Sequence, residues 1–121
     1  MERINTNLRF AVFLMLTFVL SGCGSYMMNM PTPPSQIAGL YASGFKYEHF
    51  DCRRLSSELG SLEEREYQLV IAQQERIKNS RIQAHFGTGY GLGDGIEAHG
   101  LANVRGEKEA VRRVMGVKGC L

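Results

Sequence analysis

Hydrophobic and polar positions follow a helical period in two long segments of the chain, and a glycine-rich stretch separates them. In the first segment, which follows Asp51, apolar residues recur three or four positions apart, a spacing that puts them on one face of an α-helix. These residues are Leu55, Leu59, Leu62, Leu69, Ala72 and Ile77. Glu66 interrupts the stripe, and Tyr67 or Val70 is expected to cover the gap from a flanking position. The pattern predicts a helix that ends at about Ile82.

The start of this helix carries local signals of its own. Asp51 is the predicted N-cap, because its carboxylate can accept a hydrogen bond from an open amide of the first turn. Phe50 and Leu55 have the spacing of a hydrophobic staple, whereas Arg54 stands where a capping box would have Glu or Gln. Four aromatic residues lead into the cap, and they form an aromatic patch made of Tyr41, Phe45, Tyr47 and Phe50.

Five glycines stand at every second position from 87 to 95, a density that no helix tolerates at close to 1 kcal/mol each. Beyond them the helical period returns, and it predicts a second helix from about Ile96 to Val117. Its apolar stripe consists of Leu101, Val104, Val111 and Met115, with Ala98, Ala102 and Ala110 as small neighbours.

Two helices joined by a short connector are expected to fold back on each other, so the predicted fold is an all-α antiparallel two-helix hairpin. If Cys52 faces Cys120, the residue numbers of any two positions that face each other across the hairpin add up to about 172. The predicted pairs are Leu55 with Val117, Leu62 with Ala110 or Val111, Leu69 with Val104, and Ile71 with Leu101. On the opposite face, Gln73 and Lys78 are expected to be exposed. The aromatic patch or a partner must cover the rest of the stripe.

The amino-terminal segment has the organisation of an export signal. Arg3 and Arg9 precede an apolar run from Phe10 to Leu20, which is too short to span a bilayer. The run ends in Leu-Ser-Gly-Cys, which resembles the lipobox of bacterial lipoproteins. The resemblance implies that the thiol of Cys23 receives a diacylglycerol, that cleavage precedes this cysteine, and that the new amino terminus is acylated. The lipid on Cys23 would then hold the protein at a membrane.

This resemblance divides the chain into three parts: a signal peptide over 1–22, a lipidated anchor and flexible linker over 23–40, and the hairpin domain over 41–121. Three prolines favour extended backbone in the linker, and its methionines at 27, 28 and 30 are expected near lipid headgroups or in disordered chain rather than on a soft metal. Gly24 replaces the aspartate that usually retains lipoproteins at the inner membrane. In a bacterium with two membranes, this predicts the periplasmic face of the outer membrane.

Once Cys23 is acylated, two cysteines remain. In an oxidising compartment, an even pair is typical of a disulfide, here Cys52–Cys120, and two free thiols are the alternative. The loop that it closes spans most of the domain, and the chain-entropy model gives about 4 kcal/mol of stabilisation for that length. A domain this small depends on such a crosslink.

The segment from Tyr47 to Leu59 and the sequence GDGIEAHGLANVRGEKEAV resemble a group of small bacterial envelope lipoproteins without a known role. That group has a tyrosine-rich approach to an Asp-Cys-x-x-Leu helix start and a Leu-x-x-x-x-Gly-Glu-x-x-Ala stretch in the second helix. The matching residues here are Asp51, Cys52 and Leu55, followed by Leu101, Gly106, Glu107 and Ala110. The group often has an aromatic-rich turn between its helices, and the glycine segment replaces that turn here.

Other kinds of chemistry have weak support in the sequence. Cleavage of the signal peptide would remove Arg3, Arg9 and Glu2. The number of basic residues would fall from 14 to 12 and that of acidic residues from 12 to 11, a balance that does not suggest nucleic-acid binding. The glycines do not match a phosphate-binding motif, and they favour a connector or a surface contact. The three histidines, at 49, 85 and 99, are scattered and do not form a zinc motif.

No catalytic residue, metal site or cofactor is therefore expected. Ser56 and Ser57 lack the spacing of a catalytic triad. The glutamates at 63, 64, 66, 107 and 109 are expected to pair with arginines on a solvated face. The predicted function is a non-enzymatic one, in which an envelope lipoprotein acts as a binding, accessory or scaffolding component for another envelope protein. The alternative is a membrane-active or lysis-associated lipoprotein of a mobile element, whose glycine segment meets the opposing membrane.

Overall fold

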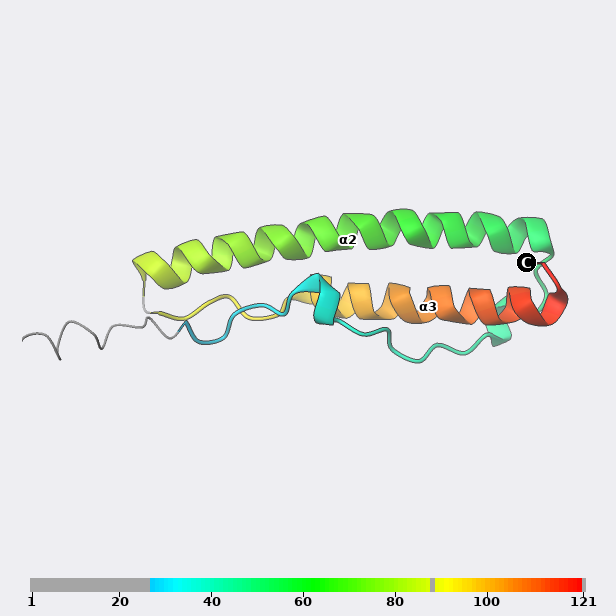
Figure 1. The fold of residues 1–121 in the computed structure, drawn as a ribbon, viewed down its shortest axis with the longest axis horizontal. Coiled ribbons are helices and arrows are strands. Elements are labelled where there is room, and N and C mark those ends of the chain that lie inside the picture. Colours follow the sequence, from blue (N-terminus) through cyan, green and yellow to red (C-terminus); the bar gives the residue numbers. More distant parts are fainter. Residues whose placement is uncertain (1–26, 88, 121) are drawn as a thin grey trace, which may run out of the picture.

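Two long helices of unequal length form an antiparallel hairpin (Figure 1), as seen in a computed structural model that describes residues 27–87 and 89–120. The elements are η1 (Pro34–Gln36), η2 (Phe45–Tyr47), α2 (Cys52–Phe86) and α3 (Ile96–Lys118). Within these residues there is no strand, and extended backbone pairs only at an isolated parallel bridge between Met28 and Tyr90. The predicted all-α hairpin is confirmed. Residues 1–22, Cys23 and Gly24, which carry the predicted export and lipidation signals, lie outside the described residues.

The two helices match over only part of their length. Helix α2 has 35 residues and α3 has 23, or about 50 and 35 Å at 1.5 Å per residue. Helix α3 therefore covers the part of α2 nearest the disulfide, and the remaining turns of α2 lie beside extended chain (Figure 1). The sequence predicted the end of the first helix at about Ile82, but α2 continues to Phe86 and ends at the first glycine of the connector.

The core lies between the two helices and includes one aromatic residue from the segment that precedes them. Its members are Tyr47, Leu55, Leu62, Val104, Ala110, Val111, Val114 and Met115. Leu59, Leu69, Phe50, Ala42 and Cys120 pack against this cluster. The predicted pairing of Leu62 with Ala110 or Val111, and of Leu69 with Val104, agrees with this cluster.

Two of the predicted pairs are wrong. Val117, which was expected to face Leu55, is 90% exposed, and Ile71, which was expected to face Leu101, is 43% exposed. Each lies two positions from a buried residue, Met115 or Gln73. Two positions correspond to roughly 200° around a helix with 3.6 residues per turn, so both side chains point away from the seam. A constant sum of residue numbers predicts which turns of the two helices lie opposite each other. It does not predict on which face of its helix a side chain lies.

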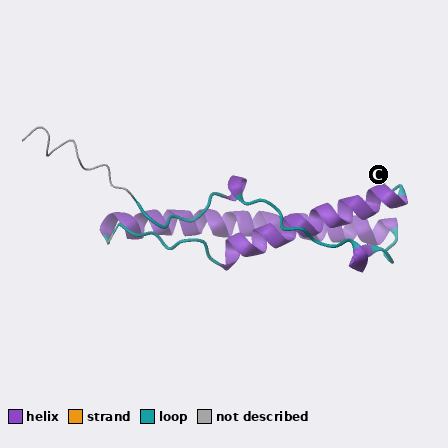
Figure 2. Cartoon of the chain, turned by 90° about the horizontal axis from the view of Figure 1, so that it is seen from below, coloured by secondary structure: helices purple, strands orange, loops and turns teal. Residues whose placement is uncertain are grey.

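The segment 27–50, here called the strap, runs along the hairpin from the glycine-rich end to the disulfide end (Figure 2). Its first part was predicted to be a flexible linker, but the described portion is hydrogen-bonded to both helices and the connector. It crosses α3 closely at Gly106, where a Cβ atom would overlap the carbonyl oxygen of Leu40. The Leu40 amide donates to the Ala102 carbonyl at 2.9 Å. Gly106 therefore allows the backbone of the strap to pass close to α3.

Candidate functional site

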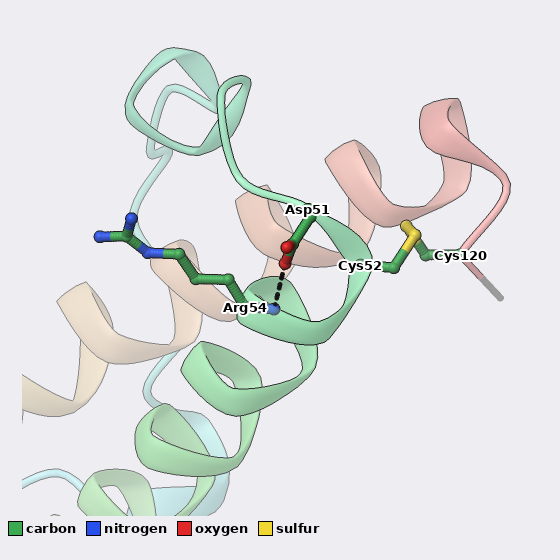
Figure 3. The surroundings of a disulfide bond; sticks show 4 residues. All are labelled: Asp51, Cys52, Arg54 and Cys120. Carbon is green, nitrogen blue, oxygen red and sulfur yellow. Dashed lines mark hydrogen bonds between the residues drawn. A yellow bond between two sulfur atoms is a disulfide. The ribbon is translucent and has the colours of Figure 1, made fainter.

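At one end of the hairpin, here called the disulfide end, the start of α2 is joined to the end of α3 (Figure 3). Cys52 and Cys120 form a disulfide with their Cα atoms 5.4 Å apart, which confirms the predicted bridge. Asp51 is the N-cap of α2, and its carboxylate accepts a hydrogen bond from the Arg54 amide at 2.7 Å. The bridge and the cap thus fix the first turn of α2 against the last turn of α3.

The aromatic patch predicted from the sequence is divided between the core and the surface. Tyr47 is 1% exposed and packs edge-to-face on the half-buried Phe50, with ring centroids 5.7 Å apart. Tyr41 and Phe45, in contrast, are exposed on the strap. Val117 of α3 is exposed near the same end. The patch therefore contributes two rings to the core and leaves two available for contacts with another molecule.

A shallow hollow of about 420 Å³ lies beside these exposed groups. It is lined by Gly44, Glu48, Arg113, Val114, Val117 and Lys118. The Arg113 guanidinium donates to the carbonyl oxygen of Ala42 at 2.7 Å and lies 5.5 Å from the centre of the Tyr41 ring. The exposed residues Tyr41, Phe45 and Val117, together with this hollow, are called the disulfide-end surface below.

Midway along the hairpin, Glu66 of α2 pairs with two cations of α3. Its carboxylate accepts hydrogen bonds from Arg105 at 2.7 Å and Lys108 at 2.6 Å. Burial alone would raise the pKa of Glu66, but the hydrogen bonds from Lys108 and Arg105 outweigh it and hold the pKa below its usual value. Arg105 also donates to the carbonyl oxygens of Pro34 and Ile37. The glutamate that interrupts the apolar stripe thus joins both helices and, through Arg105, the strap.

A second buried polar group ties the strap to α3. Tyr47 donates its hydroxyl to the Glu107 carboxylate at 3.0 Å, and Lys46 pairs with the same carboxylate at 3.0 Å. Burial raises the pKa of Tyr47, as expected for a phenol removed from water. Glu66 and Glu107 thus join separate segments of the fold, although the sequence suggested a solvated face. The exposed Glu63 and Glu109 pair with Arg112, as the sequence suggested.

The opposite end, here called the glycine end, is held by a polar network. The Asp94 carboxylate accepts from the Thr32 amide and hydroxyl, both at 2.6 Å, and from the Gln73 side-chain amide at 3.1 Å. The hydrogen bonds from Thr32 lower the pKa of Asp94. Gln73 also donates to the Thr32 carbonyl at 2.9 Å and is fully buried. The prediction that Gln73 is exposed is wrong, because its amide joins α2 to two extended segments.

Nearer the tip, Ser80 and Gly91 bring extended backbone against α2. The buried Ser80 hydroxyl accepts from the Leu92 amide at 2.7 Å. A Cβ atom on Gly91 would overlap the Ser80 hydroxyl and lie 2.7 Å from the Asn29 carbonyl oxygen. Arg76 donates to the Gly93 carbonyl at 2.8 Å. At least one of the alternating glycines is therefore required for packing and is more than a flexible connector.

The residues considered for other chemistry do not gather into one site. In the part of the chain that the structure describes, no three His, Cys, Asp or Glu side chains form a group able to hold a metal ion. His99 is exposed and lies 3.0 Å from the Asn103 side chain. None of the described helices is both long enough and apolar enough to cross a membrane. The predicted lipidation residue, Cys23, lies outside the described residues.

Comparison with known proteins adds no relative from which a role can be transferred. No family model, no curated protein and no solved structure matches this chain.

Proposed function

We propose that the protein is an envelope lipoprotein, anchored by lipid on Cys23, that serves as a binding, accessory or scaffolding component for another envelope protein. The observation that carries this proposal is the Leu-Ser-Gly-Cys sequence directly after the apolar run from Phe10 to Leu20. An apolar segment of this length, preceded by Arg3 and Arg9, is typical of an export signal. Gly24 favours the periplasmic face of the outer membrane where the source has two membranes.

The disulfide-end surface supports a binding role. Tyr41 is 88% exposed, Phe45 69% and Val117 90%. Val117 and Gly44, the residue before Phe45, line the hollow near the disulfide end, and Tyr41 lies farther along the strap, beside Arg113. Aromatic residues are enriched in protein interfaces, because ordering their side chains on binding costs little entropy. Arg113, beside Tyr41, adds a planar cation, and arginine is also enriched in interfaces. A folded envelope protein with an apolar recess and a carboxylate facing Arg113 would fit this surface.

The lipid anchor is tested by Cys23→Ser in the full chain. The substitution removes the acceptor thiol, so we expect loss of labelled palmitate and release of the protein from the membrane fraction. A variant that keeps its palmitate and resists extraction with carbonate contradicts the lipoprotein proposal.

The binding role is tested by site-specific photo-crosslinking in the intact envelope. A photoreactive phenylalanine analogue replaces Tyr41 in one variant and Tyr67 in a matched control, since Tyr67 is also exposed (64%) but belongs to α2 and not to the strap. We expect one defined adduct with another envelope protein from position 41 and none from position 67. Equal patterns from both positions contradict a binding role for this surface.

A further inference from the structure

The glycine end carries a group of exposed apolar side chains that the fold does not use. Phe86, the last residue of α2, is 83% exposed, and Ile82, one turn earlier, is 52% exposed. Tyr90 of the connector and Met28 of the strap are 53% and 48% exposed, and they form the isolated bridge at this end. These four residues, which come from three segments, are called the apolar tip.

Two exposed cations lie close in sequence to the apolar tip, and one of them, Lys78, pairs with the exposed Glu75 at 3.7 Å. From Ile77 to Leu92 the sequence contains Lys78 and Arg81 but no aspartate or glutamate, and both cations are exposed. The strap has no acidic residue before Glu48. Apolar and aromatic side chains beside exposed cations are typical of surfaces that lie at the interface of an anionic membrane. Aromatic rings in particular prefer the level of the lipid headgroups.

The path of the strap places the apolar tip close to the point of anchorage. The Met28 amide donates to the Gly89 carbonyl at 3.0 Å, and the Gly91 amide donates to the Met28 carbonyl at 2.8 Å. Met28 is therefore fixed to the tip, and it follows Cys23 by five residues. A chain of that length spans at most about 18 Å, since an extended residue spans no more than about 3.6 Å. The disulfide end lies about 50 Å farther along α2.

We propose that the apolar tip rests in the headgroup region of the membrane that holds the lipid of Cys23, with the disulfide end directed away from it. This inference rests on the lipid anchor of the proposed function. The short connection to Met28 favours contact with the protein's own membrane, because a tip fixed within about 18 Å of its anchor lies beside that leaflet. The disulfide-end surface is then presented to a partner at a distance set by the length of α2.

The sequence contains no tryptophan, so a single tryptophan reports on one position. We compare Phe86→Trp at the tip with Phe45→Trp at the disulfide end, because both replace an exposed aromatic residue. The full chain is expressed in a host that processes lipoproteins, purified from its membranes, and placed in vesicles containing phosphatidylglycerol and lipids brominated on their acyl chains. We expect the brominated lipids to quench the fluorescence of Phe86→Trp by half or more, and that of Phe45→Trp by less than a tenth.

A charge-reversed variant tests the role of the cations. Lys78→Glu together with Arg81→Glu, placed in the Phe86→Trp background, should reduce the quenching in phosphatidylglycerol vesicles by half or more. Lys118→Glu, near the disulfide end, should leave it unchanged. Loss of quenching only in the tip variant supports the proposal, and equal quenching in all variants overturns the role of Lys78 and Arg81.

Intact mass of the same samples separates the two proposals. Lipid on Cys23 with no quenching at position 86 overturns the tip proposal alone. Absence of lipid on Cys23 overturns the lipid anchor and the tip proposal with it. Protection of Phe86→Trp from iodide in water without quenching by brominated lipid means that protein covers the tip, and this result also overturns membrane contact.

Discussion

At the disulfide end, α2 packs against α3 through apolar side chains and is joined to it by Cys52–Cys120. At the glycine end the same helix meets extended backbone, through Gln73, Ser80 and the carboxylate of Asp94. Apolar contacts tolerate small shifts, whereas hydrogen bonds require donors and acceptors at fixed positions. One helix is therefore stabilised by burial along one part of its length and by directional bonds along the other.

The unequal lengths of α2 and α3 explain this difference. The final turns of α2 extend beyond the start of α3, so no second helix is available to cover them. Extended segments carry unpaired amide and carbonyl groups, which must find partners when they are placed against a helix. Polar side chains on the inner face of α2 supply some of these partners, and glycines allow the close approach. We infer that the disulfide end forms the more stable part of the fold.

Removing the bridge should have the largest effect on the disulfide end. Cys52→Ser together with Cys120→Ser opens a loop that spans most of the described domain, and the expected loss is about 4 kcal/mol in the free energy of unfolding. Urea denaturation of the oxidised protein and of the variant measures it. A change below about 1 kcal/mol would mean that the closed loop contributes little.

Truncation of a core side chain tests the apolar packing at the same end. Leu62 is 1% exposed, and Leu62→Ala should cost about 2 to 5 kcal/mol because it leaves a cavity between the helices. Ser61→Ala, on the exposed adjacent position, should change stability by less than about 0.5 kcal/mol. Small and equal effects in a denaturant titration would show that the seam does not hold the isolated protein together.

Two neighbouring glutamines provide a matched test at the glycine end. Gln73 is fully buried and donates two hydrogen bonds, whereas Gln74 is exposed. Gln73→Ala leaves groups of Thr32 and Asp94 without their donor, and it should cost about 1 to 3 kcal/mol. Gln74→Ala should cost less than about 0.5 kcal/mol. If both variants have the same denaturation midpoint, the polar network does not stabilise this end.

The smallest expected effect is a dependence of the glycine end on pH. The pKa of Asp94 is lowered in the folded protein, so its carboxylate stabilises the fold above the unfolded pKa of about 4. This contribution is lost as the pH falls through the lower, folded pKa. At pH 7, Asp94→Asn should be less stable than the original protein by no more than about 1 kcal/mol, because Asp94 is exposed and water screens its charge. The difference should close below the folded pKa, and a constant difference across the titration would exclude the carboxylate as its cause.

The disulfide end was predictable because its sequence signals are periodic or local. The stripe through Leu55 and Leu62 follows the helical period, and Asp51 is recognised by its position before that stripe. The two cysteines stand at the outer ends of the two predicted helices, so an antiparallel hairpin brings them together. Periodicity also gave the correct turn-to-turn register, although it misplaced Val117 and Ile71 on their helices.

The glycine end was not predictable in this way, because its contacts join residues that have no common period. A buried Gln73 has the same local signature as an exposed glutamine, and only its distant partners Thr32 and Asp94 distinguish it. Gly106 is one sequence signal for a contact of this kind, since a glycine inside a predicted helix often indicates the close approach of another backbone. The backbone that passes there is that of Leu40, and its position depends on the path of the strap. The prolines of the strap predict a flexible linker and give no information on that path.

Native-state hydrogen exchange resolved along α2 tests most directly whether the two ends are separate units. In the oxidised protein, we predict a high opening free energy for amides between Leu55 and Leu69 and a lower one between Gln73 and Phe86. Cys52→Ser together with Cys120→Ser should lower the first value toward the second and leave the second unchanged, because the glycine end opens without breaking the bridge. A single opening free energy along the whole of α2, falling uniformly in the variant, would mean that the two ends are not separate units.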